Sequence, residues 1–164
     1  MTPSQPTRPR QTDADPAARD AVDPSAAAHG APLFVASLSV RWRDLDAFNH
    51  VNNSTYLTYI EEARLLWLQQ LNDWMSGESA PILAASELNY RKPIVWPASL
   101  HVQLRCERLG NSSITLSHRI VDAADAACVY CDGRTVLVWI NPRLGKPVPL
   151  PPTVRAAAAG TPDH

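Results

Sequence analysis

This sequence contains little cysteine, and its cysteines are not paired in a way that indicates a site. The three are Cys106, Cys128 and Cys131, an odd number in a domain of ordinary size. Cys128 and Cys131 have C-x-x-C spacing, which can indicate metal binding or redox chemistry. No second pair of cysteine or histidine residues accompanies them, and residues three apart on a strand point to opposite faces. We therefore expect no metal site.

Two further absences exclude classes of partner. The chain lacks any apolar run near the roughly 18 residues of a membrane-spanning helix, so we expect no membrane span. Its formal net charge of −1 leaves no strongly basic face, so we expect no nucleic acid partner. Residues 1–31 have neither the apolar stretch of a secretory signal nor the acid-poor composition of a transit peptide. Together these features predict a soluble, cytoplasmic protein.

Proline is abundant but is concentrated near the two ends of the sequence. Six of the fifteen prolines fall in residues 1–32 and six in residues 141–164. Residues 1–31 lack aliphatic periodicity, so they cannot bury enough apolar surface to offset the entropy cost of ordering. We predict a disordered N-terminal tail at 1–31, one domain at 32–151, and a disordered C-terminal tail at 152–164.

Hydrophobic periodicity predicts an α+β domain. Residues 33–42 alternate between apolar and polar side chains, as in a strand with one face in water. Residues 54–71 have apolar side chains at helical spacing, on a stripe too wide for a surface helix. Further strand-like runs follow at 82–92, 100–107, 114–120 and 127–140, and we expect a hairpin turn at 110–112 and a second turn at 122–126. Because so apolar a helix needs cover, this order predicts one long helix packed on a curved antiparallel sheet of about five strands.

Three details of these strand-like runs can be compared with a structure. Alternation in run 82–92 places Ile82, Ala84, Leu88 and Tyr90 on one face. Gly133 is expected to form a bulge in the last run. His118 lies on an apolar strand face, where we expect a core histidine with a hydrogen-bonding partner.

The polar turn between the first strand and the helix carries the residues best suited to chemistry. Asp44 and Asp46 lie at the strand end, His50 follows four residues after Asp46, and Asn53 or Ser54 would cap the helix. A helix start offers unpaired backbone N–H groups and the positive end of the helix dipole, which can stabilise negative charge that develops beside a carboxylate. The same residues could instead be ordinary turn and cap residues.

Two other charged pairs allow a structural or a functional interpretation. Glu61 and Arg64 lie three apart on one helix face, where they could form a local ion pair or a partly buried pair at the border of a site. Arg91 and Lys92 stand at a strand end, where they could be solvated or could meet phosphate groups.

Residues 41–64 resemble the signature of hotdog-fold acyl-CoA thioesterases in the 4-hydroxybenzoyl-CoA thioesterase superfamily. The matching positions are Arg41, Trp42, Asp44, Asp46, His50, Val51, Asn52, Asn53, Tyr56, Leu57, Tyr59, Glu61, Ala63 and Arg64. The expected β-α-β-β-β-β order is also that of the hotdog fold, and the resemblance covers about residues 33–151. Asn49 replaces the usual glycine. Asn tolerates a left-handed backbone, so we expect the turn to persist, with a side chain that could narrow the pocket.

This resemblance implies hydrolysis of an acyl-CoA to a free acid and CoA, with no cofactor. The family's catalytic carboxylate corresponds to Asp46, which would attack the thioester through a mixed anhydride or activate a water, with Asp44 in support. His50 would orient the turn or the thioester, and backbone N–H groups around Asn52 and Asn53 would hold the carbonyl oxygen. Further expected substrate-binding residues are Tyr56, Glu61, Arg91 and Lys92.

Two other functional classes remain open. Hotdog proteins include dehydratases and hydratases that act on acyl thioesters, but these use different His/Asp or His/Glu settings. A hotdog domain could also bind an acyl thioester without catalysis, and such a module would not need Asp46. The H-V-N-N turn favours hydrolysis. Similar proteins build each active site at a subunit interface, so we expect a homodimer or homotetramer.

Overall fold

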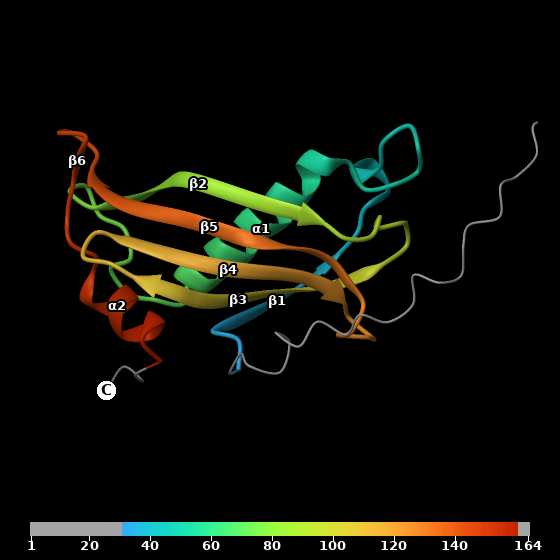
Figure 1. The fold of residues 1–164 in the computed structure, drawn as a ribbon. Coiled ribbons are helices and arrows are strands. Elements are labelled where there is room, and N and C mark those ends of the chain that lie inside the picture. The colour runs from blue at the N-terminus through green and yellow to red at the C-terminus, as the bar shows by residue number, and fades with distance from the viewer. Residues whose placement is uncertain (1–30, 161–164) are drawn as a thin grey trace, which may run out of the picture. The chain divides into compact units, whose positions relative to one another are not determined.

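An antiparallel, curved sheet of six strands is the frame of the computed structural model, which describes residues 31–160. Its strands lie in the order β1 (Phe34–Ser39), β3 (Ser99–Leu109), β4 (Ser113–Asp122), β5 (Val129–Asn141) and β2 (Ala80–Tyr90), and β6 (Lys146–Pro147) also pairs with β5. The helices are α1 (Asn53–Leu68) and α2 (Pro152–Ala158), and a 3-10 turn, η2, covers Trp42–Asp44. Figure 1 shows α1 running across one face of the sheet.

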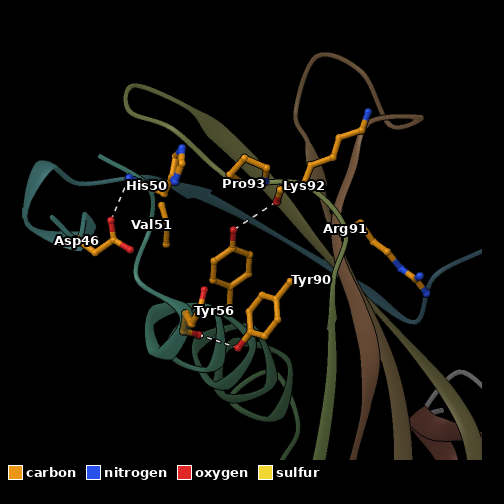
Figure 2. A pocket seen from close by; sticks show the side chains of 9 residues that line it. Asp46, His50, Val51, Tyr56, Tyr90, Arg91, Lys92 and Pro93 are labelled. Atoms are coloured by element: carbon orange, nitrogen blue, oxygen red, sulfur yellow. Dashed lines mark hydrogen bonds between the residues drawn. The ribbon is translucent and has the colours of Figure 1, made fainter. Parts of the chain in front are cut away.

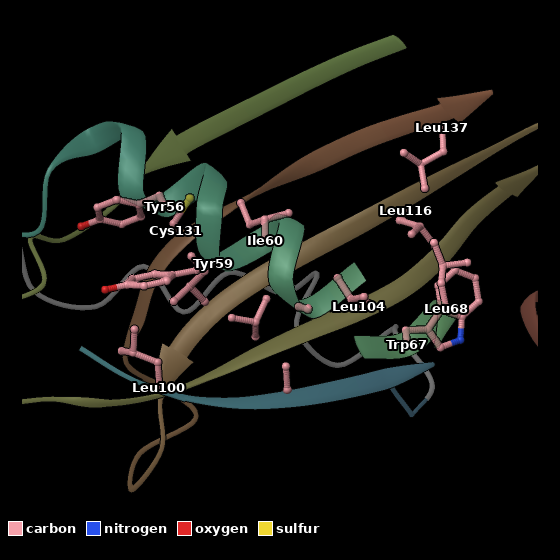
Figure 3. Close-up of a cluster of buried hydrophobic side chains, with 14 of the residues drawn as sticks. Tyr56, Tyr59, Ile60, Trp67, Leu68, Leu100, Leu104, Leu116, Cys131 and Leu137 are labelled. Carbon is pink, nitrogen blue, oxygen red and sulfur yellow. The ribbon is translucent and has the colours of Figure 1, made fainter. Parts of the chain in front are cut away.

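Helix α1 forms where the spacing of apolar residues predicts it, although it ends at Leu68 rather than at residue 71. One side of it is buried, including Tyr59, Ile60 and Trp67. These side chains pack against the inner face of the sheet, together with Leu104 of β3 and Leu116 of β4, as Figure 3 shows. The rest of the wide apolar stripe stays open, since Leu57 and Leu66 are 41% and 38% exposed.

The two predicted turns after β3 and β4 are confirmed. Residues 110–112 join β3 to β4 as a tight hairpin, with Gly110 N–H donating to the Ser113 carbonyl at 2.8 Å. The carboxylate of Asp122 accepts hydrogen bonds from the backbone N–H groups of Ala124 and Asp125, which shapes the turn into β5. Both turns depend on neighbours in the sequence, which is why the pattern predicts them.

Strand β2 differs from the expected alternation because a register shift lies between Leu83 and Ala85. Ile82 pairs with Val138, whereas Tyr90 pairs with Cys131, a buried residue of the inner face. An extra residue in a strand moves all later side chains to the other face. The prediction that Ile82 and Tyr90 share a face is therefore wrong.

The bulge expected at Gly133 is also not found, since Gly133 pairs regularly with His118 on one side and Leu88 on the other. Instead, the absence of a side chain at Gly133 allows the neighbouring strand β2 and the His118 ring to lie close to its backbone. A Cβ at this position would lie 1.9 Å from the Glu87 carbonyl oxygen and 2.9 Å from His118 Nε2. No side chain fits in that space.

The prediction of a disordered tail at 152–164 is wrong for residues 152–158, which form α2. Pro152 occupies the start of this helix, a position that suits its fixed φ angle. Val154 and Ala158, four residues apart, are buried against the core. Thr153 Oγ1 donates to the Asn72 carbonyl at 2.7 Å, so apolar burial and hydrogen bonding both anchor this segment. The predicted N-terminal tail, apart from Ala31, and residues 161–164 lie outside the described residues.

Among the described residues, no helix has the length and apolar character needed to cross a membrane.

Candidate functional site

The carboxylate of Asp46 is fixed by its own turn. Its Oδ1 atom accepts hydrogen bonds from Phe48 N at 2.8 Å and from His50 N at 3.3 Å. The Asp46 N–H donates to the His50 carbonyl at 2.8 Å, which closes the loop. Asn49 has the expected left-handed backbone, with a φ of 59°. Oδ2 accepts no hydrogen bond within residues 31–160, so one oxygen is held while the other is available to a ligand.

Asp44 connects this turn to the body of α1. Its Oδ2 atom accepts from Arg41 N at 2.8 Å and from the Tyr59 hydroxyl at 2.7 Å. Its carbonyl accepts from Asn52 N at 2.8 Å. Burial, together with the neighbouring Asp44 carboxylate, raises the pKa of Tyr59 far above its usual value, so this hydroxyl keeps its proton.

The helix begins one residue earlier than a cap at Asn53 would place it, and two residues earlier than a cap at Ser54 would. Asn52 is the N-cap, and its side-chain oxygen accepts from Ser54 N at 2.9 Å and from Ser54 Oγ at 2.7 Å. The Asn52 side chain is thereby committed to the cap. Asn53 is the first helical residue and lines the pocket described below.

Two tyrosines form a wall beside the helix start. The rings of Tyr56 and Tyr90 meet edge to face, with centroids 5.0 Å apart. The Tyr90 hydroxyl donates to the Asn53 carbonyl at 3.0 Å, and the Tyr56 hydroxyl accepts from Ile94 N at 3.2 Å. Burial raises the pKa of both hydroxyls. Sequence reasoning placed Tyr56 at the site but missed Tyr90, which comes from the far end of β2.

These elements enclose a pocket of about 240 Å³. Its lining combines the turn, the first turn of α1 and the segment after β2: Asp46, His50, Val51, Asn53, Tyr56, Tyr90, Arg91, Lys92 and Pro93. Figure 2 shows this grouping, with His50 beside Pro93 and the two tyrosines beside the helix. Six residues expected at the site therefore come together. Asn49, expected to narrow the pocket, is not among the lining residues.

Glu61 lies elsewhere. It borders a separate hollow on the exposed side of α1, with Thr58, Glu62, Leu65, Leu66 and Gln69. Glu61 is eight residues beyond the helix start, so more than two turns separate it from Asn53. Within one chain, Glu61 is therefore not part of the Asp46 pocket.

The two cations at the pocket differ in what they contact. Arg91 Nε and Nη2 donate to the two carboxylate oxygens of Asp132 at 2.7 and 3.0 Å. Burial favours a higher pKa for Asp132, but hydrogen bonds from Arg91 and Asn89 bring the pKa below its usual value. The side chain of Lys92, whose Nζ lies 4.0 Å from Cys128 Sγ, makes no such ion pair within residues 31–160. Figure 2 shows both side chains directed away from Asp46.

Comparison with known proteins gives a consistent result. The PA2801 protein of Pseudomonas aeruginosa, a candidate thioesterase, is 38% identical over 77% of this chain and 98% of its own, with a TM-score of 0.73. A candidate acyl-CoA thioesterase of Xanthomonas campestris is 47% identical over 66% of this chain and 92% of its own, with a TM-score of 0.62. The long-chain acyl-CoA thioesterase FadM of Escherichia coli is 28% identical, over 69% of this chain and 87% of that protein.

A family model also matches most of the described domain. It covers residues 40–158, which include the Asp46 turn, all of α1 and every strand of the sheet except β1. The arrangement of helix and curved antiparallel sheet is that of the hotdog thioesterases among the similar structures. The chain belongs to the thioesterase-like superfamily.

Proposed function

We propose that this protein hydrolyses acyl-CoA thioesters to the free carboxylic acid and CoA, with Asp46 as the catalytic carboxylate. One observation carries the proposal: Asp46 lines the same pocket as Asn53, the first residue of α1. A base or nucleophile and the backbone N–H of Asn53 at the positive end of the helix dipole thus face one pocket. Oδ1 of Asp46 is held by two backbone donors, which leaves Oδ2 for the reaction.

In the proposed reaction, the thioester carbonyl oxygen lies at the start of α1, where the backbone N–H of Asn53 and the helix dipole stabilise the developing negative charge. The neighbouring N–H groups of Ser54 and Thr55 already donate to Asn52. Oδ2 of Asp46 either attacks the carbonyl carbon, to give a mixed anhydride that water then cleaves, or removes a proton from the attacking water. In both routes the C–S bond breaks, CoA leaves as the thiol, and water supplies the second oxygen of the acid. His50 donates its backbone N–H to Asp46 and lines the pocket in which we place the thioester.

For CoA binding we propose Lys92 as the pocket's phosphate-binding cation. Arg91 already makes a bidentate ion pair with Asp132, so its recruitment by a phosphate would break two hydrogen bonds. Lys92 has no such competitor within residues 31–160. Lys92→Ala should raise KM with a smaller change in kcat. The exposed Arg43→Ala provides a control for loss of one positive charge.

The function is tested with Asp46→Asn, which keeps the shape and polarity of the side chain but removes its basicity. We expect kcat for the best acyl-CoA to fall by a factor on the order of 10² or more, with a much smaller change in KM. Release of free thiol across a panel of acyl-CoAs is the assay. Asp125→Asn is a matched control, because Asp125 Oδ1 also accepts a hydrogen bond from the N–H two residues on, but in the turn between β4 and β5, and Asp125 does not line the pocket.

Three other results of these experiments would contradict the proposed function or its mechanism. Binding of acyl-CoA by the folded protein without thiol release would indicate a binding module. Hydration of an enoyl-CoA without hydrolysis would indicate a hydratase. Unchanged turnover by folded Asp46→Asn would exclude the proposed mechanism.

We also propose that the protein is a homodimer or homotetramer. β2 is an edge strand, and Ile82 and Leu83 on it are 45% and 51% exposed. An open edge with apolar side chains favours pairing with another chain. Light scattering at micromolar concentration should give at least twice the mass of 18.0 kDa, and Leu83→Glu should lower it.

A further inference from the structure

Tyr59 forms a long-range hydrogen bond to the catalytic turn from a position outside the pocket. Its hydroxyl donates to Asp44 Oδ2 at 2.7 Å, across 15 residues of sequence. The side chain is 5% exposed and is packed in the core beneath α1. The same carboxylate oxygen accepts from Arg41 N at 2.8 Å. Asp44 is thus held from the start of its turn and from the second turn of the helix.

The segment between Asp44 and the helix is closed by other hydrogen bonds. Asn52 N donates to the Asp44 carbonyl at 2.8 Å, Asp46 N donates to the His50 carbonyl at 2.8 Å, and Leu45 bridges to Val51. These contacts fix the turn internally and at the helix cap. Tyr59 adds a contact from within the rigid helix, so it restrains the whole turn against rotation about the cap.

We propose that Tyr59 is a positioning residue for thioester hydrolysis, which holds Asp46 at a fixed place relative to the N-terminus of α1. This inference rests on the proposed function, in which Asp46 reacts at a carbonyl bound by that N-terminus. Asp44 is two residues from Asp46, so a shift of Asp44 moves the reactive carboxylate. Displacement of a reacting group by about 1 Å can lower a rate by up to 10²-fold.

A second tyrosine–aspartate pair in the same chain provides a matched control. The Tyr130 hydroxyl donates to Asp122 Oδ2 at 3.0 Å. This pair has the same chemistry, but it braces the turn between β4 and β5, and neither residue lines the pocket that Asp46 lines. A loss of activity that follows only from general loosening of the fold would appear in both pairs.

The experiment compares Tyr59→Phe with Tyr130→Phe by steady-state thiol release. Tyr59→Phe should lower kcat on the order of tenfold with KM changed less than about twofold, since only the transition-state alignment is lost. Tyr130→Phe should retain the wild-type kcat. Both variants should unfold cooperatively, which circular dichroism during heating would verify.

Variants of Asp44 test whether Tyr59 acts on kcat through its hydrogen bond to Asp44. Asp44→Ala should reduce kcat at least as much as Tyr59→Phe, because it removes the hydrogen bond from Arg41 N as well as the one from Tyr59. The double variant should be no slower than Asp44→Ala alone, because the Tyr59 hydroxyl has no acceptor once the Asp44 carboxylate is gone. Asp44→Asn should largely restore kcat, since an amide oxygen can still accept from the Tyr59 hydroxyl.

The outcomes separate this inference from the function on which it rests. Wild-type kcat in folded Tyr59→Phe, an equal loss in Tyr130→Phe, or a loss confined to KM would each overturn the positioning role. If Asp46→Asn is inactive in the same assay, the proposed function then stands without it. If Asp46→Asn retains full activity, the proposed function fails, and the role of Tyr59 fails with it.

Discussion

Two places where polar side chains enter the interior of the described domain differ in whether the hydrogen bonds of those side chains are satisfied. Around the turn of residues 44–52, Asp44 and Tyr59 bind each other, and Asn52 binds the first helical turn. Beneath the middle of α1, both ring nitrogens of His118 and the hydroxyl of Thr135 lack a hydrogen-bond partner among residues 31–160. Unmet polar groups in an apolar interior cost stability, whereas the satisfied groups hold a defined geometry.

The region under α1 also contains a buried charge without an ion-pair partner among residues 31–160, which increases the difference between the two places. Arg64 is 7% exposed and makes no hydrogen bond or ion pair within residues 31–160, and burial lowers the pKa of its guanidinium, opposed in part by Glu61. Burial, and then the nearby Arg64, lower the pKa of His118 to about 4. His118 is therefore neutral at physiological pH. The hydrogen bonds of the turn hold a carboxylate in a fixed position. The buried polar groups under α1 make no hydrogen bonds among residues 31–160, so they do not stabilise the fold.

The largest loss of stability is expected from adding a side chain at Gly133, where β2 and the His118 ring lie close to the glycine. In Gly133→Ala, the new Cβ would meet the Glu87 carbonyl oxygen at 1.9 Å and His118 Nε2 at 2.9 Å. Because one of these atoms is backbone, two strands must separate, and we expect a loss of about 3 kcal/mol or more in the free energy of unfolding. Urea denaturation measures it. The control is Gly77→Ala, where a Cβ meets nothing within 4 Å; similar curves for both variants would contradict the prediction.

Acid should destabilise the region under α1 through His118. The unfolded histidine takes up a proton near pH 6.5, whereas the folded one resists until about pH 4. The stability is thus complete above pH 6.5 and is lost as pH falls toward 4, by roughly 3 kcal/mol from this group. Arg64 disfavours the proton on His118, and Asp132 favours it.

His118→Gln removes this titration, so the measurement is the difference between wild type and variant in urea denaturation from pH 7 to pH 4. The stability of the wild type should decrease more steeply than that of the variant. Parallel curves would mean that His118 is not buried in its neutral form.

The same comparison explains how much the sequence could predict. The contacts of the turn join residues that are close in sequence, such as Asp46 with Phe48 and His50. Local spacing and the family signature therefore predicted Asp46, His50 and Asn53 together, and the structure brings them to one pocket. The order of the strands and the long helix along the chain, and the turns after β3 and β4, could be predicted for the same reason. The order of the strands within the sheet was not predicted, since β2 pairs with β5 and not with its sequence neighbour β3.

What could not be predicted depends on partners far away in the chain. Tyr90 joins the pocket through a hydrogen bond to Asn53, 37 residues earlier. The helix α2 is held by contacts that cross more than 40 residues, including Arg155 with Gly110. His118 was correctly expected in the core but not to lack a partner, since periodicity reports the face of a strand and not the chemistry opposite it.

Two buried or half-buried arginines provide a smaller test. Arg155 Nη2 donates to the carbonyls of Gly110 and Asn111 at 2.8 and 3.0 Å, whereas Arg64 makes no hydrogen bond among the described residues. Arg155→Met should lower the free energy of unfolding by about 1–2 kcal/mol, because two carbonyls lose a charged donor. Arg64→Met should leave it unchanged or raise it, because an unpaired buried charge is removed. Urea denaturation of both variants decides, and a larger loss in Arg64→Met would mean that Arg64 has a partner in the assembled protein.

The smallest effect, and one of opposite sign, is expected from exchanging a hydroxyl for a methyl group at two threonines. Thr135 is 1% exposed and its hydroxyl has no partner within residues 31–160, so Thr135→Val should raise the free energy of unfolding by up to about 1 kcal/mol. Thr153 Oγ1 instead donates to the Asn72 carbonyl at 2.7 Å, so Thr153→Val should lower it by about 1 kcal/mol. The shapes of the two side chains are nearly equal, which makes the sign of the change a report on the hydrogen bond alone. If Thr135→Val is destabilising to the same extent as Thr153→Val, the Thr135 hydroxyl has an acceptor in solution, and the contrast between the turn and the region under α1 does not hold there.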